Sequence, residues 1–322
     1  MFVVFLRLCA VFLMIGLGWL ARTRGVVDGP TTNRLARLLT FYVYPALIFS
    51  SMVQRFTLAS LVDKWLLPAG SFGIMATGFV AGLILLPWFG GRRSAQGRGF
   101  HFQATINNYS FLAMPLALFY WGEEGLANVI FSTLGGELAM WTLGVYALTE
   151  TRLSRASLRR LVSPPIMAVF AALATIAIRD GLGLADGLAE NRLALALAQV
   201  WQSGLDGLSV FGGATIPVAM VVAGSRIADL GAAHVIRLRQ LRVVAVRLIV
   251  VPALAVIWIS RLPIPTDIAN VLVLIAVMPS AVSSVMLSEI FDGDVEFAAA
   301  SVLLTHLCCL LTVPLWFYLF GF

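Results

Sequence analysis

The sequence has few charged residues. Of its 322 residues, 22 are Lys or Arg and 16 are Asp or Glu, which is 12% of the chain. A soluble domain usually contains about 25% charged residues. Apolar residues make up 60% of the chain, and its mean hydropathy is +0.94. Too little polar surface remains to cover a globule in water, which excludes a soluble enzyme, a nucleic-acid-binding protein and a disordered chain.

The sequence also lacks the motifs of common catalytic and metal sites. Its three histidines are far apart, and it contains no HExxH, DDxxD or GxSxG motif. The three cysteines, Cys9, Cys308 and Cys309, lie in apolar stretches without CxxC spacing, and we expect them to be packing residues. We therefore expect neither an intramembrane enzyme nor a metal or cofactor.

Long apolar runs dominate the sequence. A helix that crosses a bilayer needs about 20 apolar residues. The first run lacks the basic start and the cleavage site of a secretory signal, so we interpret it as a true first span. The predicted spans are 2–21, 35–53, 65–89, 101–120, 126–148, 164–179, 204–224, 242–260, 267–288 and 297–320. The sequence thus predicts an all-α membrane protein with ten transmembrane helices.

The basic residues between these spans predict the orientation. The loops after spans one, three, five and seven hold 15 Arg, whereas the loops after spans two, four, six and eight hold five Lys or Arg. Because cytoplasmic loops carry the excess of basic residues, we expect a multi-pass protein of the cell (inner) membrane with both termini outside. Arg247 lies close to the start of span eight, and we expect its side chain to snorkel to the interface.

Ten spans divide into two halves of five, residues 1–150 and 151–322. Since five is odd, two similar halves would have opposite orientations and form an inverted repeat. Pro45 in span two and Pro217 in span seven lie 172 residues apart, and Pro115 in span four and Pro279 in span nine lie 164 apart. A mid-helix proline removes a backbone hydrogen bond, so these four prolines are the predicted helix-break positions.

Polar side chains surround the prolines of spans four and nine. One such proline in a transmembrane helix usually marks a simple kink, but two at matching positions favour interrupted helices. Interrupted helices expose N-terminal amides with partial positive charge at mid-membrane, which suits an anion. The candidate substrate-binding residues are Asn107, Asn108, Tyr109, Ser110, Pro115, Pro279, Ser280, Ser283 and Ser284.

Several stretches, in order and spacing, resemble the auxin efflux carrier family. They are Asn108–Pro115, Met278–Val285, Gly212–Met220, Tyr44–Phe49 and Ser301–Pro314. The resemblance implies two inverted five-helix repeats whose broken helices four and nine cross, as in bile acid symporters and sodium–proton antiporters. It also implies a scaffold of spans one, two, six and seven, a mobile transport domain of spans three to five and eight to ten, elevator-type alternating access, and a homodimer.

The loop at Thr151–Ser163 is short, which is similar to the bacterial branch of that family, often described as malate or malonate permeases. Asn108 matches the family's crossover asparagine, which is implicated in binding the substrate carboxylate. The alternative is that Asn107 or Asn108 only caps a half-helix. The resemblance implies a secondary active transporter of a small organic anion; a sodium-coupled carrier of the bile acid symporter type and a nontransporting sensor are the alternatives.

Two ionisable residues lie inside predicted spans. Glu137 in span five and His306 in span ten lie 169 residues apart, at equivalent places of the two halves. Ionisable groups at this depth are functional candidates, and both are candidates for H⁺ coupling. The alternatives are a protonated Glu bonded to a neighbouring helix and a packed neutral His. Ser132 and Thr133, just before Glu137, are candidates for coordinating Na⁺ instead.

Overall fold

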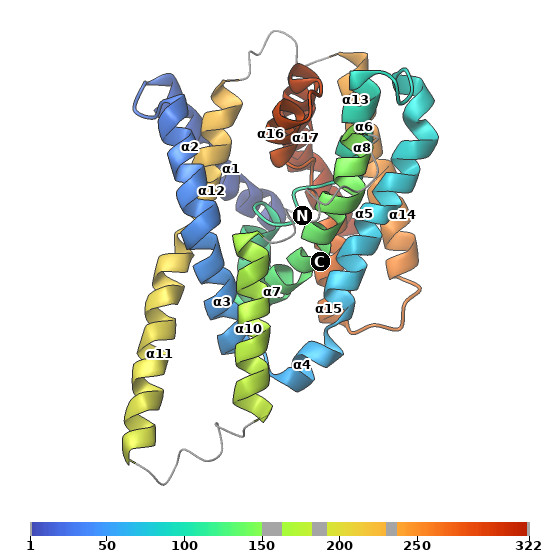
Figure 1. Ribbon diagram of the computed structural model, residues 1–322. Coiled ribbons are helices and arrows are strands. Elements are labelled where there is room, and N and C mark those ends of the chain that lie inside the picture. The colour runs from blue at the N-terminus through green and yellow to red at the C-terminus, as the bar shows by residue number, and fades with distance from the viewer. Residues whose placement is uncertain (1, 150–162, 182–191, 230–236, 321–322) are drawn as a thin grey trace.

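The computed structural model describes residues 2–149, 163–181, 192–229 and 237–320, which form a bundle of helices (Figure 1). These residues contain no β-strand, and one isolated β-bridge. Seven helical segments of the described chain are long and apolar enough to cross a membrane: Gly29–Arg55, Leu58–Phe89, Ala113–Thr149, Pro164–Gly181, Leu195–Ala228, Leu238–Ile259 and Val295–Phe320. The predicted class, an all-α multi-pass membrane protein, is confirmed.

The first half begins with α1 (Phe2–Thr23) and α2 (Gly29–Leu38). The Asp28 carboxylate caps α2 by accepting the Thr31 N–H at 2.7 Å. A π-helical turn, Leu39–Val43, continues α2 into α3 (Tyr44–Arg55). Pro45 lies in the first turn of α3, where its missing N–H is tolerated. The helix therefore changes its hydrogen-bonding pattern before Pro45 and is not interrupted there.

The first half continues with the segment from α4 to α5 and the segment from α6 to α8. A short helix, α4 (Leu58–Asp63), leads into α5 (Leu66–Leu85), which ends in the 3₁₀ turn Leu86–Phe89. Then come α6 (Ala95–Thr105), α7 (Ala113–Ala139), a π-helical turn at Met140–Gly144 and α8 (Val145–Thr149). Gly122 bends α7 sharply, with a φ of 63° that suits glycine. This bend separates the second part of predicted span four from predicted span five.

The second half repeats several of these features. Its helices are α10 (Pro164–Gly181), α11 (Arg192–Gly213), α12 (Thr215–Ala228), α13 (Leu238–Ala245), α14 (Val251–Ile259), α15 (Thr266–Ala276), α16 (Ser283–Ile290) and α17 (Val295–Phe320). A π-helical turn, Val246–Val250, joins α13 to α14. Pro217 lies in the first turn of α12, just after the break at Ala214 that separates α12 from α11.

The difference between seven spanning segments and ten predicted spans has a structural reason. Predicted spans four and nine are each divided between two helices, and the first span contributes only a shorter apolar stretch, Leu8–Thr23. Predicted spans one, four and nine are therefore not represented by separate long apolar helices among the seven. The ten-span count and the inverted repeat remain predictions.

The helices form two groups that also contact each other, α3 against α7 and α1 against α17. In one group α1 packs against α12, and α3 packs against α10 and α11. In the other, α5 packs against α6, α7 and α15, and α13 packs against α17. In Figure 1, α3, α11 and α12 stand on the left, and α5, α13 and α14 stand on the right.

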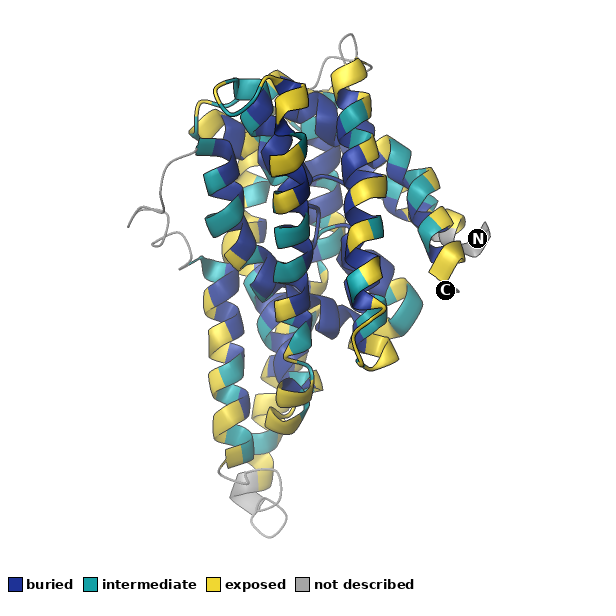
Figure 2. Ribbon diagram, turned by 90° about the vertical axis from the view of Figure 1, so that its right-hand side faces the viewer, coloured by how far each residue is buried: buried dark blue, intermediate teal, exposed yellow. Residues whose placement is uncertain are grey.

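The outer surface is apolar and the interior contains polar side chains. Leu13, Val210 and Leu311 are 67%, 81% and 73% exposed. Figure 2 shows that exposed positions follow the outer faces of the helices, with buried positions on the faces that meet. Asn107 and Arg247 are fully buried. Apolar residues outside and polar groups inside are the pattern expected for a protein surrounded by lipid.

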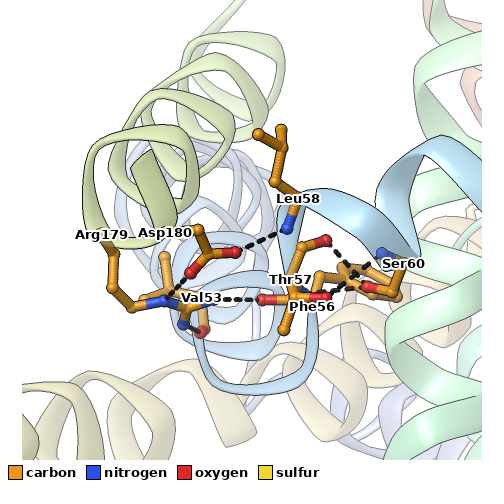
Figure 3. Close-up of polar contacts among 7 residues, drawn as sticks. All are labelled: Val53, Phe56, Thr57, Leu58, Ser60, Arg179 and Asp180. Atoms are coloured by element: carbon orange, nitrogen blue, oxygen red, sulfur yellow. Dashed lines mark hydrogen bonds and ion pairs between the residues drawn. The ribbon is translucent and has the colours of Figure 1, made fainter. Parts of the chain in front are cut away.

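The connection between α3 and α4 is held by the end of α10 (Figure 3). The Arg179 guanidinium donates to the carbonyls of Val53 and Phe56, at 2.7 Å each. The Asp180 carboxylate accepts the Leu58 N–H at 2.6 Å and the Arg179 Nε–H at 2.7 Å. These two adjacent residues of α10 thus satisfy backbone groups at the end of one helix and the start of the next.

Candidate functional site

Two helix breaks meet inside the bundle. Residues 106–112 interrupt the path from α6 to α7, and residues 277–282 interrupt the path from α15 to α16. Asn107 and Ser280 form an antiparallel β-bridge. Asn108 N–H donates to Pro279 O at 2.8 Å, and Ala281 N–H donates to Ile106 O at 3.3 Å. Each break thereby satisfies backbone groups of the other, which a nonpolar membrane interior requires. We call residues 106–112 and 277–282 together the crossover.

The two prolines of the crossover region have different positions. Pro279 lies within the second break, where its carbonyl accepts the Asn108 N–H. Pro115 lies in the first turn of α7, so it follows the first break and begins the second part of that helix.

The two asparagines of the crossover bind different partners. The buried Asn107 amide donates to Ile275 O, near the end of α15. Asn108 Oδ1 accepts the Leu112 N–H at 3.3 Å at the start of α7, and Asn108 Nδ2 lies 3.2 Å from His306 Nε2. Asn107 thus holds a helix C-terminus, whereas Asn108 holds a helix N-terminus and contacts an ionisable residue.

Glu137 is held by two donors. The Tyr109 hydroxyl donates to Glu137 Oε1 at 2.9 Å, and Trp141 Nε1–H donates to Oε2 at 3.2 Å. The Tyr109 ring lies flat against Gly136, where an added Cβ would come within 2.6 Å of the ring. The missing side chain of Gly136 therefore gives Tyr109 the space to reach Glu137.

A cavity of about 250 Å³ borders the crossover. Seven of the predicted site residues line it: Asn107, Asn108, Tyr109, Ser110, Ser283, Glu137 and His306. The cavity is also lined by apolar residues of α1, α12 and α16, among them Ile15, Met220 and Met286. The crossover and both ionisable candidates therefore face one space, from residues far apart in the sequence.

The remaining predicted site residues are not among those that line the cavity. The Ser132 and Thr133 hydroxyls donate to the carbonyls of their own helix, Val129 O and Ile130 O, at 2.6 Å each. Ser284 Oγ accepts from Gln103 Nε2 at 2.9 Å, and the Ser280 N–H donates to Thr305 Oγ1 at 3.3 Å. Ser284, at the start of α16, and Ser280, within the crossover, therefore bond to neighbouring elements outside the cavity lining.

Most of the cavity lining was not predicted, including two aromatic side chains and a charged one. Tyr44, Trp141 and Arg226 line the cavity together with the crossover. Arg226 Nη2 also donates to Asn33 Oδ1 at 3.3 Å. In the sequence Arg226 counts only as a loop charge that sets orientation, because it lies in the last turn of α12. Its position at the end of an apolar run gives no local signal that it also faces a cavity.

The expectation that Arg247 snorkels to the interface is wrong. Its side chain is fully buried and donates to three backbone carbonyls. Nη1 reaches Ala104 O at 3.2 Å, Nη2 reaches Ala276 O at 2.7 Å, and Nε reaches Met278 O at 3.2 Å. These carbonyls belong to the last turn of α6, the end of α15 and the second break. The unsatisfied carbonyls of the broken helices hold Arg247 inside the protein, which sequence position alone did not reveal.

No group of three or more His, Cys, Asp or Glu side chains that could hold a metal ion occurs in the described ranges. The cavity instead contains one carboxylate, one imidazole and one guanidinium among amide, hydroxyl and apolar groups. Such a lining is suited to binding a small polar solute in a nonpolar surrounding.

A membrane protein whose interrupted helices pair beside a polar cavity has the architecture of a transporter. A family model described as "Membrane transport protein" matches residues 3–157 and 149–317. The chain belongs to this family, which is the family of the auxin efflux carriers. The resemblance stated from the sequence motifs is therefore confirmed.

Two archaeal relatives cover nearly the same length. An uncharacterized transporter of Methanothermobacter thermautotrophicus is 26% identical over 95% of each chain. An uncharacterized transporter of Methanocaldococcus jannaschii is 25% identical, also over 95% of each chain. The protein is thus a membrane transporter, in agreement with the expectation that it is not an enzyme.

Proposed function

We propose that the protein is a secondary active transporter of a small organic anion, specifically a carboxylate. The observation that carries this proposal is the cavity at the crossover, which is lined by Asn108, by the N-cap residue of α7 and by the first turn of α16. Helix N-termini carry partial positive charge and free N–H groups, which favour anions. A neutral amide donor binds a carboxylate without the desolvation penalty of an ion pair.

The Asn108 side chain has one N–H group available to bind a carboxylate. Its Nδ2 carries two N–H groups, and one of them is directed to His306. Within the described residues no second acceptor of Nδ2 is found, and Asn108 lines the cavity. A carboxylate oxygen in the cavity can accept this second N–H. The Arg226 guanidinium adds a full positive charge at another part of the lining.

The two groups of helices support an elevator mechanism. Spans one, two, six and seven correspond to α1, α2–α3, α10 and α11–α12, which pack together. We assign them to a scaffold and assign spans three to five and eight to ten to a transport domain. The crossover, Glu137 and His306 all belong to the second set, whereas the lining residues Tyr44 and Arg226 belong to the first. Movement of one set past the other would expose the cavity to either side of the membrane.

The coupling ion is assigned to H⁺, with Glu137 and His306 as its carriers. Both residues are in the cavity lining, so a proton on either can change how an anion is held. The sodium-coupled alternative with Ser132 and Thr133 has less support, because both hydroxyls bond to their own helix and neither is a lining residue.

We assign the protein to the cell membrane, with both termini outside. The turn between α1 and α2, the turn before α6, the end of α12 and the start of α13 all lie at the upper end of Figure 1. The basic loops after spans one, three and seven belong to these turns, so this end would face the cytoplasm. From the family we also expect a homodimer.

The first experiment is a thermal-shift screen of small carboxylates on the purified protein, with dicarboxylates such as malate and malonate beside aromatic monocarboxylates such as benzoate. A ligand that binds the folded state raises Tm. The carboxylate with the largest shift is then radiolabelled for uptake and efflux in proteoliposomes.

The same vesicles test the site. Asn108→Ala should abolish most of the flux, and Asn270→Ala, on α15 and outside the cavity lining, is the matched control. Unchanged transport by Asn108→Ala would remove this residue from the site. Binding without flux in the wild type would favour a nontransporting sensor.

A further inference from the structure

Arg247 is the buried group that the proposed transport cycle leaves unexplained. It lies in the π-helical turn between α13 and α14, far in sequence from the crossover, yet it bonds to both interrupted helices. Among the described residues no carboxylate forms an ion pair with it. A guanidinium keeps its charge in a protein interior, so the compensating negative charge must come from its carbonyl partners.

The carbonyl partners of Arg247 carry more negative charge than carbonyls in the middle of a helix. The last carbonyls of a helix have no partner within the helix and carry the negative end of the helix dipole. In transporters with discontinuous helices, substrate anions bind at half-helix N-termini, and coupling cations bind at unwound carbonyls and half-helix C-termini. In this chain the carbonyls of Ala104, Ala276 and Met278 are of the second kind, and Arg247 donates to all three.

We propose that the Arg247 guanidinium is a resident cation of the crossover, which fills the place of a coupling Na⁺ ion and holds both broken helices in one register. This proposal deepens the proposed function and rests on it: a carrier with a covalently attached cation at these carbonyls needs no Na⁺, and H⁺ at Glu137 or His306 is left as the coupling ion. Arg247 is a positioning residue, because it acts on the substrate site through the crossover.

The shape of the guanidinium explains why arginine stands here. Its planar fork directs Nε, Nη1 and Nη2 to carbonyls on two separate chain segments at the same time. A lysine ammonium is a point charge that would retain the positive charge but lose part of this geometry. Lysine is therefore a conservative variant that separates the effect of charge from that of shape.

The test is the thermal stability of the purified protein in NaCl and in choline chloride of equal concentration, without substrate. Wild type should have the same Tm in both salts. Arg247→Ala should have a Tm lower by several degrees in choline chloride and should recover part of it in NaCl, because its emptied carbonyls accept Na⁺. Arg247→Lys should be less stable than wild type and indifferent to the salt. The matched control is Arg242→Ala, which removes a partly exposed arginine of the preceding helix and should be indifferent to the salt.

Two results would overturn the proposal. One is a wild type that Na⁺ stabilises over choline, which would mean that a separate sodium site exists, for example at the unpartnered buried oxygens Asn107 Oδ1 and Ser280 Oγ. The other is an Arg247→Ala protein whose Tm does not depend on the salt. If Arg247→Ala does not fold, the Tm values of wild type and Arg247→Lys still test the proposal. A higher Tm of either protein in NaCl than in choline chloride would contradict it, because the guanidinium or ammonium should already occupy the carbonyls. Because this stability test contains no substrate, a negative result for Arg247 can be distinguished from a failure to transport carboxylates.

Discussion

Asn108 Nδ2 and His306 Nε2 lie 3.2 Å apart at the edge of the cavity. His306 Nδ1 lies 2.8 Å from Val302 O, and a carbonyl only accepts, so Nδ1 carries the proton. Asn108 Oδ1 accepts the Leu112 N–H, which fixes Nδ2 as the group that faces the ring. His306 Nε2 is therefore the acceptor, and the imidazole is neutral in this arrangement. His306 orients the amide that we assign to the substrate.

This relationship predicts the effect of His306→Leu. The change removes the acceptor of Asn108 Nδ2, so only the Leu112 N–H, through Oδ1, still holds the amide in its orientation. The loss of one neutral hydrogen bond corresponds to about 0.5–1.5 kcal/mol. We expect roughly 3- to 10-fold weaker binding of the carboxylate identified in the screen, measured by ligand titration of Tm.

His306→Gln is the matched control, since the Gln side-chain oxygen can accept from Asn108. It should retain affinity closer to wild type than His306→Leu does. Equal affinity of the Leu variant and wild type would show that His306 does not orient Asn108 for binding.

A second prediction concerns Glu137→Gln. A glutamine cannot exchange a proton, and its NH₂ group would face one of the two donors that now bind the carboxylate, Tyr109 or Trp141. We expect transport to lose its dependence on the proton gradient, and stability to fall by about 1–3 kcal/mol because a buried donor loses its acceptor. Uptake in vesicles with and without an imposed pH gradient checks the first effect, and thermal unfolding checks the second.

The exposed Glu123, at the bend before the same helix segment, offers the control variant Glu123→Gln, which should behave as wild type in both measurements. A Glu137→Gln protein that still concentrates substrate in response to the pH gradient would exclude Glu137 as the proton carrier.

The positions of the breaks could be predicted because their signals are local. Proline and clustered asparagine or serine interrupt runs that are otherwise apolar, and such residues demand hydrogen-bond partners in a membrane. The second break at residues 277–282 contains Pro279, and the first at residues 106–112 contains Asn107 and Asn108. Proline alone was not sufficient, since the helix continues through Pro45 with only a π-helical turn before it.

The contacts of the charged residues could not be predicted in the same way. Arg247 bonds to carbonyls 29, 31 and 143 residues away, so no pattern near it in the sequence contains its partners. Counting from the start of predicted span eight placed it near an interface, but the helical segment begins at Leu238, so Arg247 lies near the middle of that segment. Arg226 shows the same limit, because most of the cavity that it lines is formed by other helices.

A third prediction tests the packing of α1 against α12. At Gly224 an added Cβ would lie 1.9 Å from Ile15 O, so Gly224→Ala must push the helices apart. Overpacking of this kind costs about 1–3 kcal/mol. Gly204→Ala on α11 is the control, because nothing lies within 4 Å of its added Cβ and alanine favours helix. We expect a lower Tm for the first variant and an unchanged or higher Tm for the second; equal stabilities would contradict the close helix contact.

The last prediction concerns the contacts of Arg179 and Asp180 with the α3–α4 connection (Figure 3). This connection joins predicted span two, of the scaffold, to span three, of the transport domain. The Asp180 side chain is 23% exposed and accepts the Leu58 N–H at the start of α4, so Asp180→Ala removes a cap. We expect stability to fall by about 1 kcal/mol and the Leu58 amide to exchange with solvent deuterium faster than in wild type.

Arg179→Ala should lower the stability more than Asp180→Ala does, because two carbonyls, of Val53 and Phe56, lose their donor. Asp63→Ala, at the exposed end of α4, is the control and should leave the exchange of Leu58 unchanged. If α10 anchors the connection, exchange rises at residues 56–58 in both α10 variants while the centre of α3 stays protected. Wild-type exchange at Leu58 in Asp180→Ala would mean that Thr57, which caps α4 through Ser60, suffices to hold the start of α4.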